Sequence, residues 1–201
     1  MIISVTNRLL CKGNFLARIE QIARLQPHSI ILREKDLLPE NYEQLAAECL
    51  KICSRFNVPL VVNSYPDIAR KLKIPNIHLP LELFIKHRTD PEVFQTSVSV
   101  HSVEEARLSE DLGACFLIAG HIFPTECKKG VSPRGLDFLK QVCDSVSIPV
   151  FAIGGITQFN VRDVLKAGTQ GICIMSELMT CENPGDVLKS FRSCFPAAGF
   201  L

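Results

Sequence analysis

Residues 149–156 have the sequence PVFAIGGI, and residues 171–176 have the sequence GICIMS. Between them lies a stretch with Val161, Val164 and Leu165 at helical spacing. Runs that are apolar throughout, rather than alternating, are typical of strands buried on both faces, as in a parallel sheet. The region therefore predicts two parallel strands joined by a helix, each ending on a glycine or serine.

The rest of the chain follows the same pattern, because short β-rich stretches alternate with longer helical ones. Eight strands that alternate with helices, without a linker, predict a closed (β/α)8 TIM barrel with a parallel eight-stranded sheet. We expect residues 1–201 to form this single domain. The alternative, an open doubly wound sheet, usually carries a glycine-rich turn after its first strand, but here that strand runs into Thr6-Asn7-Arg8. The predicted strands are Ile2–Thr6, Ser29–Arg33, Pro59–Asn63, Asn76–Leu79, Gln95–Val100, Ala114–Ile118, Pro149–Ile153 and Gly171–Met175.

Capping residues predict where several helices begin and end. Pro39 opens a helix over residues 39–56, and Ser102 with Glu105 forms a capping box. The other predicted starts are Ser64 before Pro66, Thr157 before Val161 and Asn183 before Pro184, and the predicted stops are Gly113 and Gly168.

Composition excludes several classes of protein. The chain is 47% hydrophobic with a formal net charge of +1, so it is globular and carries no basic excess that would indicate a nucleic-acid partner. No apolar run is long enough to span a membrane, and Met1–Val5 is a first strand rather than a signal peptide. The nine cysteines form no CxxC pair or zinc motif, so we expect free thiols and a cytoplasmic location.

Polar residues and glycines gather at the predicted strand ends, where TIM barrels carry their chemistry. Gly154 and Gly155 follow the seventh strand, and Ser176 follows the eighth. Glycines let the backbone approach an anion, and a helix beginning at Ser176 would direct its amide dipoles to the same point. These three residues are therefore predicted to bind a phosphate group, although a tight turn and an N-cap would give the same pattern.

Two further segments carry titratable or charged groups. The long stretch after the sixth strand contains His121, a residue type suited to proton transfer near neutral pH, and Lys128, which could close over a phosphate. Lys129 is as well explained by solvated surface. Arg33 ends the second strand and can grip a carboxylate or phosphate through two nitrogens, or form an internal ion pair with Glu34 or Glu105.

These residues, in this order, resemble the superfamily of thiamine-phosphate synthases and TenI-like thiazole tautomerases. The resemblance extends from Leu32–Lys35 through Asn63 and residues 99–106 (SVHSVEEA) to residues 152–156 (AIGGI) and Ser176. It implies a (β/α)8 barrel that binds a thiazole phosphate in thiamine biosynthesis. The substrate-binding residues implied by it are Arg33, Lys35, Asn63, His101, Thr125 and Lys128.

The two branches of the superfamily differ at specific positions. A synthase couples a pyrimidine pyrophosphate to the thiazole phosphate and needs magnesium held by aspartates, but this chain has Ser64 and Glu82 near the expected positions. Ile31 replaces the synthase glutamine, and Cys127 replaces one hydroxyl of its Thr-x-Thr-Lys loop. His121 after Gly120 resembles the tautomerase branch instead.

The resemblance therefore favours an isomerase that aromatises a thiazole carboxylate phosphate tautomer. His121 would be the catalytic base, Arg33 would orient the carboxylate, and no metal or cofactor is expected. A thiamine-phosphate synthase that uses Mg²⁺ is the first alternative, and a non-catalytic or regulatory barrel that binds thiazole phosphate is the second. The partner in each case is a small phosphorylated thiazole; a homodimer is compatible with the sequence but not decided by it.

Overall fold

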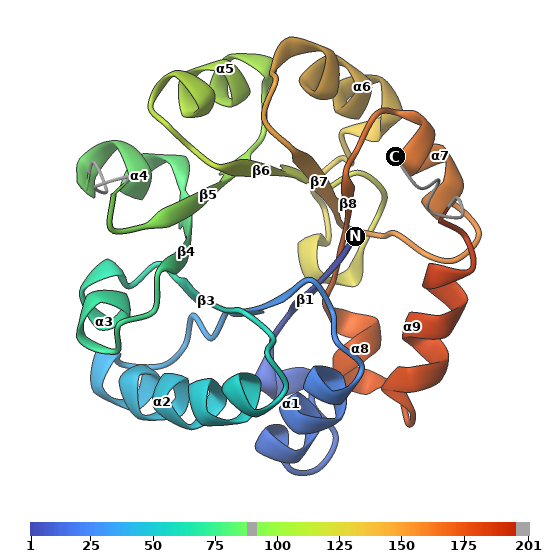
Figure 1. Cartoon of the computed structure of the whole chain (residues 1–201). Helices are drawn as coiled ribbons and strands as arrows, with labels where there is room; N and C mark the ends of the chain where they lie inside the picture. Colours follow the sequence, from blue (N-terminus) through green and yellow to red (C-terminus); the bar gives the residue numbers. More distant parts are fainter. Residues whose placement is uncertain (88–91, 196–201) are drawn as a thin grey trace.

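The computed structural model describes residues 1–87 and 92–195, which form a closed barrel of parallel strands surrounded by helices (Figure 1). Each strand pairs with the next in sequence, and β1 pairs with β8 through the register Ile3↔Cys173. The (β/α)8 prediction is thus confirmed, and the open doubly wound sheet is wrong. The strands are β1 (Ile2–Val5), β2 (Ser29–Leu32), β3 (Leu60–Asn63), β4 (Asn76–Pro80), β5 (Gln95–Val100), β6 (Phe116–Gly120), β7 (Val150–Ile153) and β8 (Gly171–Ile174).

Helices lie outside the strands, and two short 3₁₀ helices lie in loops. Figure 1 shows the α-helices arranged around the barrel, with α8 and α9 following the last strand. The α-helices are α1 (Phe15–Arg24), α2 (Pro39–Arg55), α3 (Pro66–Lys71), α4 (Leu81–His87), α5 (Val103–Asp111), α6 (Gly135–Ser145), α7 (Val161–Lys166), α8 (Ser176–Thr180) and α9 (Pro184–Arg192), and the 3₁₀ helices are η1 (Arg8–Leu10) and η2 (Glu126–Lys128).

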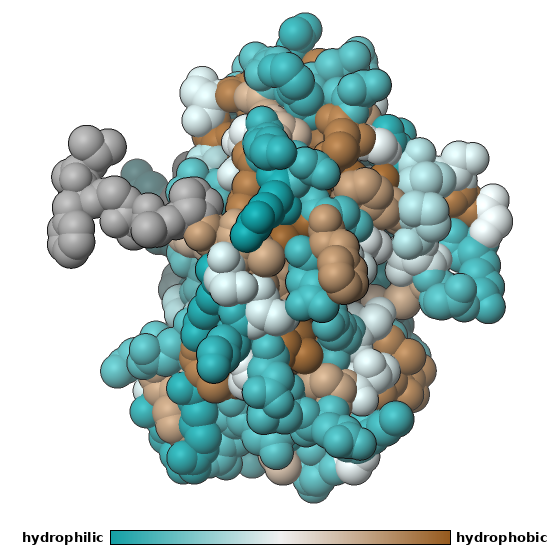
Figure 2. All heavy atoms as spheres, turned by 90° about the vertical axis from the view of Figure 1, so that its right-hand side faces the viewer, coloured by the Kyte–Doolittle hydropathy of each residue, from teal (hydrophilic) through white to brown (hydrophobic). Residues whose placement is uncertain are grey.

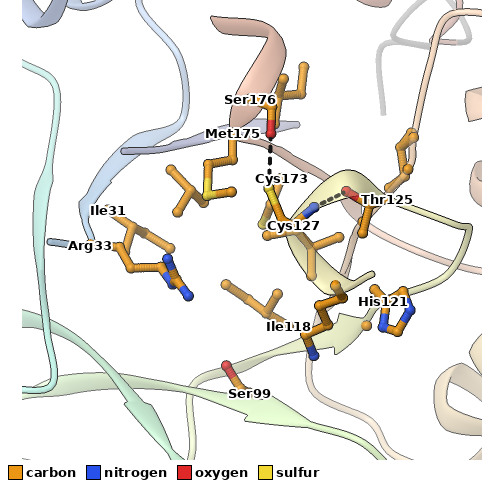
Figure 3. A pocket seen from close by; sticks show the side chains of 18 of the residues that line it. Ile31, Arg33, Ser99, Ile118, His121, Thr125, Cys127, Cys173, Met175 and Ser176 are labelled. Carbon is orange, nitrogen blue, oxygen red and sulfur yellow. Dashed lines mark hydrogen bonds between the residues drawn. The ribbon is translucent and has the colours of Figure 1, made fainter. Parts of the chain in front are cut away.

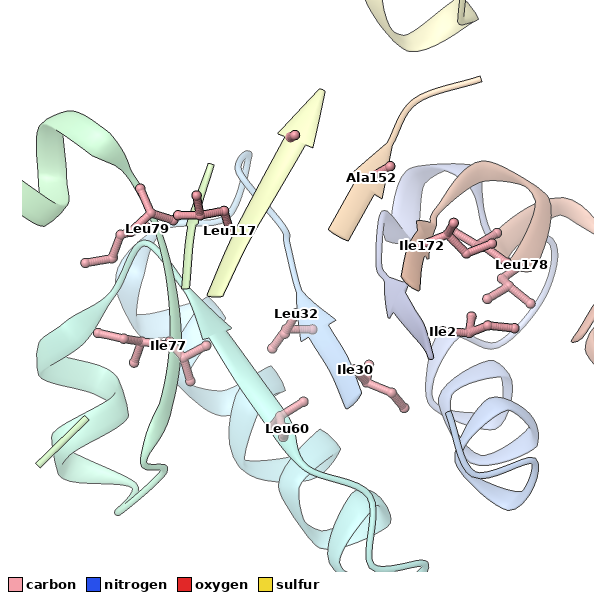
Figure 4. Close-up of a cluster of buried hydrophobic side chains, with 14 of the residues drawn as sticks. Ile2, Ile30, Leu32, Leu60, Ile77, Leu79, Leu117, Ala152, Ile172 and Leu178 are labelled. Carbon is pink, nitrogen blue, oxygen red and sulfur yellow. The ribbon is translucent and has the colours of Figure 1, made fainter. Parts of the chain in front are cut away.

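Apolar side chains form two layers because each strand is buried on both faces. In β2, Ile30 and Leu32 belong to the layer between strands and helices, whereas Ile31 points into the barrel interior. Figure 4 shows part of the outer layer, which includes Leu79 of β4 and Leu117 of β6. Burying each such side chain stabilises the fold by about 1.5–3 kcal/mol. This two-sided burial explains the continuous apolar runs in the sequence.

Several predicted helix boundaries are confirmed. The α2 helix begins at Pro39, and Ser102 Oγ accepts a hydrogen bond from Glu105 N at 3.1 Å. Asn183 Oδ1 accepts one from Gly185 N at 2.9 Å, at the start of α9. Gly113 and Gly168 follow α5 and α7 with φ of +88° and +102°, the left-handed conformation typical of helix ends.

Three sequence predictions were wrong in detail. Thr157 does not cap α7: its hydroxyl accepts from Phe159 N, and the helix begins at Val161. Ser64 does not cap α3, because it adopts φ +67° and its hydroxyl accepts from the Asn63 amide instead. The sixth strand is Phe116–Gly120 rather than residues 114–118, since Ala114 still bonds to the end of α5.

Figure 2 shows the side of the molecule at the right of Figure 1, where hydrophilic residues cover most of the surface and hydrophobic ones are interspersed. Among the residues that the structure describes, no helix combines the length and the apolar character needed to cross a membrane.

Candidate active site

A pocket of about 380 Å³ opens at the carboxyl ends of the strands, as expected for this fold. Figure 3 shows Arg33 and His121 on opposite sides of it, with Ser176 and Ser99 on the other two sides. Every residue predicted for the site lines this pocket, although their roles remain predictions. These residues are Arg33, Lys35, Asn63, His101, His121, Thr125, Lys128, Gly154, Gly155 and Ser176.

The two glycines after β7 are required by the loop that packs on them. Gly154 and Gly155 have φ of +101° and +65°. A Cβ on Gly154 would lie 2.3 Å from His121 Cβ, and one on Gly155 would lie 2.5 Å from the Pro124 carbonyl oxygen. Phe123 N donates to Gly154 O at 3.0 Å, which fixes the loop there. Loop packing alone therefore demands glycine, whether or not an anion binds.

The predicted phosphate-binding serine begins a helix at the pocket edge. Ser176 is the first residue of α8, and first-turn amides have no partner within their own helix. The Ser176 hydroxyl lies 3.3 Å from Cys127 Sγ, a contact between α8 and the loop after β6 (Figure 3). This contact brings the residues that follow strands six and eight together, although they are far apart in sequence.

Three cationic side chains line the pocket without a carboxylate partner among the described residues. None of the ion pairs found within residues 1–87 and 92–195 includes Arg33, Lys35 or Lys128. Burial, followed by the charges of Arg33 and Lys128, lowers the pKa of Lys35. Unpaired cations that repel one another favour an anionic ligand. Lys129, in contrast, pairs with Glu126 at 2.6 Å on the surface.

The internal ion pair considered for Arg33 is absent, because both carboxylates are used elsewhere. Glu34 is 2% exposed and accepts hydrogen bonds from the Thr6 hydroxyl at 2.5 Å and from Arg8 N at 2.9 Å. Thr6 Oγ1 accepts in turn from Arg33 N at 3.0 Å. Burial raises the pKa of Glu34, partly offset by these hydrogen bonds. Glu105 accepts from His101 N. The guanidinium of Arg33 is thus left for a ligand.

His121 follows β6 and is held by the loop that it begins. Its backbone carbonyl accepts from Arg134 N at 3.0 Å, and its ring is buried. The ring Nε2 lies 3.2 Å from the Val131 carbonyl, which can only accept, so Nε2 carries the proton. A neutral His121 therefore has its lone pair on Nδ1, the nitrogen that a general base would use.

His101 is a second imidazole oriented by a carbonyl. Its Nδ1 lies 2.8 Å from the Gly120 carbonyl and must donate to it. In the neutral ring the lone pair then lies on Nε2. The two histidines thus present opposite nitrogens as potential bases at the same pocket.

The sequence predicted His78 within the fourth strand and Ser99 within the fifth, but neither was assigned to the site. Both line the pocket, and His78 lies between Ser97 Oγ at 2.9 Å and Ser99 Oγ at 2.7 Å. The signal was available, since residues 97, 99 and 101 share one face of a strand by its two-residue period.

The donors at the mouth do not fit a magnesium site of the kind that the synthase resemblance implies. Magnesium prefers carboxylate oxygens with substrate phosphates. Glu82 is exposed on α4 and does not line the pocket, and the Ser64 hydroxyl is engaged by Asn63. Within the described residues, Glu177 is the one carboxylate in the pocket lining, and burial raises its pKa. No group of three or more His, Cys, Asp or Glu residues there could hold a metal ion.

Comparison with known proteins identifies the family. Residues 2–178 match the family TMP-TENI, described as thiamine monophosphate synthase. The chain belongs to this family. It is 34% identical over 180 residues to thiamine-phosphate synthase of Clostridium botulinum (strain Hall), covering 87% of this chain and 88% of that protein. It is also 34% identical to the putative thiamine-phosphate synthase 2 of Aquifex aeolicus (strain VF5), covering 86% and 94%.

A solved structure supports the same family. Thiamine phosphate pyrophosphorylase from Pyrococcus furiosus superposes with a TM-score of 0.82 at 25% identity, covering 96% of this chain and 94% of that one. The comparisons confirm the superfamily predicted from the sequence. The relatives carry the synthase name, so they favour the alternative reading over the tautomerase branch, which none of these names indicates.

Proposed function

We propose that this chain is an enzyme of thiamine biosynthesis that binds a phosphorylated thiazole in the pocket at the barrel mouth. The family supports the pathway, and the unpaired cations support an anionic ligand. Arg33 and Lys35 come from the segment after β2, and Lys128 comes from η2 in the segment after β6. The ligand's phosphate would lie near Gly154, Gly155 and Ser176.

The reaction has two candidates, each favoured by a different observation. The names of the relatives favour magnesium-dependent coupling of a pyrimidine pyrophosphate to the thiazole phosphate. The side chains favour proton transfer, because the pocket offers an oriented imidazole at His121, while residues 1–87 and 92–195 contribute no set of carboxylates for magnesium. We propose the second reaction, a thiazole tautomerase type of isomerisation, and the observation that carries it is the Nδ1 lone pair of His121.

In this proposal the enzyme moves protons on a bound dihydrothiazole carboxylate phosphate. His121 removes the proton from the ring carbon that bears the carboxylate, and a proton is returned to the exocyclic carbon of the conjugated double bond. The ring becomes aromatic, which drives the reaction. Arg33 orients the carboxylate, and His101, anchored through Nδ1, lies at the same pocket with Nε2 able to accept a proton.

The test is the rate of aromatisation, followed by ultraviolet absorbance in excess chelator. We expect acceleration by the wild type and a loss of roughly 10²–10⁴-fold in His121→Gln, the range typical of a positioned acid–base group. Lys129→Ala, a substitution at a surface ion pair outside the pocket lining, is the control and should keep full turnover. Full turnover in His121→Gln would remove His121 from the mechanism.

Thiamine-phosphate synthase is the second candidate, because the relatives' names support it. It predicts strict Mg²⁺ dependence and release of pyrophosphate when the pyrimidine pyrophosphate and thiazole phosphate are supplied together. Turnover in this assay, with none in the chelator assay, would establish the synthase. Binding of thiazole phosphate without either activity would leave the non-catalytic barrel. The same proposal includes a cytoplasmic location and a single domain over residues 1–201. It leaves the homodimer as the oligomeric state to be measured.

A further inference from the structure

Asn160 precedes the first residue of α7, but its side chain does not cap that helix. It is the N-cap residue by position, and its side chain accepts no hydrogen bond from the first turn of α7. The side chain is bonded instead to the loop after β7. Asn160 Nδ2 donates to Gly155 O at 3.0 Å, and Asn160 Oδ1 accepts from Thr157 N at 2.8 Å. Asn160 thus joins the two residues on either side of Ile156.

The bond to Gly155 O fixes the orientation of one peptide group. A trans peptide is planar, so its carbonyl and its N–H point in opposite directions. Gly155 O points to Asn160, and the N–H of Ile156, which belongs to the same peptide, therefore points away from Asn160. The preceding peptide is held in the same way, because Gly154 O accepts from Phe123 N at 3.0 Å. The N–H of Gly155 thus points away from Phe123.

The two amides oriented in this way have no acceptor within the part of the chain that the structure describes. Neither Gly155 N nor Ile156 N donates a hydrogen bond to residues 1–87 or 92–195, and both residues line the pocket. Successive backbone N–H groups without internal partners form concave sites that bind anions. Gly155 has φ of +65°, and glycine has access to more backbone conformations than other residues. A side chain that holds the Gly155 carbonyl therefore restricts a segment that is otherwise free to rotate.

We propose that Asn160 is a positioning residue, which holds the peptide between Gly155 and Ile156 so that Ile156 N–H donates to the ligand's phosphate. The inference rests on the phosphate position given by the proposed function. Asn160 does not line the pocket, so it acts on the ligand only through this peptide. Without the Asn160 side chain the peptide can rotate and turn the Gly155 carbonyl toward the anion, which a carbonyl oxygen repels. A residue that only stabilised the loop would leave the affinity for phosphate unchanged.

The first test is a titration of ¹⁵N-labelled protein with inorganic phosphate, followed through amide chemical shifts. In the wild type we expect the amide protons of Gly155 and Ile156 to shift downfield as they donate to the anion. In Asn160→Ala the Kd for phosphate should rise by about threefold to tenfold, the effect of one neutral hydrogen bond, and the Ile156 shift should be lost. Asn183→Ala is the matched control, because the Asn183 side chain also makes two hydrogen bonds at the start of a helix, but outside the pocket lining. Its affinity for phosphate should equal that of the wild type.

A second variant separates positioning from helix stability. Asn160→Ser keeps a residue type that is favoured at helix starts, but its single hydroxyl is too short to bond both Gly155 O and Thr157 N. It should unfold at nearly the wild-type urea concentration and bind phosphate as weakly as Asn160→Ala. Wild-type affinity in Asn160→Ser would overturn the proposal.

The same titration distinguishes this inference from the proposed function. If phosphate shifts neither the Gly155 nor the Ile156 amide in the wild type, the proposed phosphate position is wrong and the positioning role of Asn160 falls with it. If the wild type shows both shifts and the Asn160 variants bind phosphate more weakly, the positioning role is supported even in a protein that fails the aromatisation assay.

Discussion

The pocket has two walls that are specified in different ways. The β4–β5 wall is polar, and hydrogen bonds join Ile77 O, Ser97, His78 and Ser99 along it. The wall after β7 is made of Gly154 and Gly155, whose missing side chains let the backbone of residues 121–124 pack directly on them. The shape of the β4–β5 wall is thus set by its hydrogen bonds, whereas the wall after β7 is set by the absence of side chains at two positions.

Burial alone does not reveal the role of a histidine in this pocket. His78 and His121 are 6% and 4% exposed. Both nitrogens of His78 are occupied by serines, whereas Nδ1 of His121 has no partner among the described residues. In our proposal the second ring is therefore the one that transfers protons.

The largest expected effect comes from adding atoms to the β7 wall. Gly154→Ala places a Cβ within 2.3 Å of His121 Cβ at φ +101°, and we expect a loss of about 2–4 kcal/mol in the free energy of unfolding. Gly13→Ala is the matched control, because Gly13 has φ +88° but nothing within 4 Å of the added atom. Urea denaturation compares the two. Equal losses would mean that backbone conformation, not contact with His121, requires the glycine.

The second prediction is that acid destabilises the β4–β5 wall and so lowers the free energy of unfolding. The pKa of His78 is lowered in the folded state, so its stabilising contribution is complete above the unfolded value of 6.5 and is lost as the pH falls toward 3. The loss attributable to this ring between pH 7 and pH 5 is about 2 kcal/mol. Urea denaturation at both pH values measures it. His78→Gln should show a shallower pH dependence than the wild type, and parallel curves would refute the assignment.

How far the sequence predicted the structure depends on the range of the interaction. Continuous apolar runs predicted the strands, because burial on both faces is encoded within each run, and the strand ends predicted which residues converge on the mouth. The predicted cap of α7 was wrong, because Thr157 is a residue type that caps helices but its hydroxyl accepts a hydrogen bond in a local turn before Val161.

The hydrogen bonds among Ser97, His78 and Ser99 could not be predicted in the same way. They depend on pairing between β4 and β5 that sets His78 opposite Ser97, and no local pattern encodes which carbonyl a serine meets. The sequence also left open whether Arg33 pairs with Glu34. In the structure it does not, because Glu34 accepts hydrogen bonds from the Thr6 hydroxyl and from Arg8 N instead. Residue types and strand ends predicted which residues line the pocket, but contacts between strands determine their hydrogen-bond partners.

A third prediction concerns the unpaired cations between the two walls. Arg33→Ala should weaken binding of thiazole carboxylate phosphate by roughly tenfold to a hundredfold, because a charge-assisted hydrogen bond to the carboxylate contributes about 1.5–3 kcal/mol. Stability should change little, since the guanidinium makes no ion pair within the described residues and Lys35 is relieved of a like charge. Calorimetry and thermal unfolding measure the two quantities. Arg70→Ala, on the surface and paired with Asp67, is the control for binding. Equal affinity of Arg33→Ala and wild type would place the ligand away from β2.

The smallest effect expected is a change in thiol reactivity beside the β7 wall. Cys127 is exposed and its Sγ lies 3.3 Å from Ser176 Oγ, so a ligand phosphate at Ser176 should slow its alkylation by iodoacetamide. Cys115 is also exposed but does not line the pocket, and its rate should not change with ligand. Mass spectrometry of both peptides, with and without thiazole phosphate, gives the two rates. If binding is detected by calorimetry while both cysteines react at unchanged rates, the phosphate does not lie at Ser176, and the cations near β2 would be its site instead.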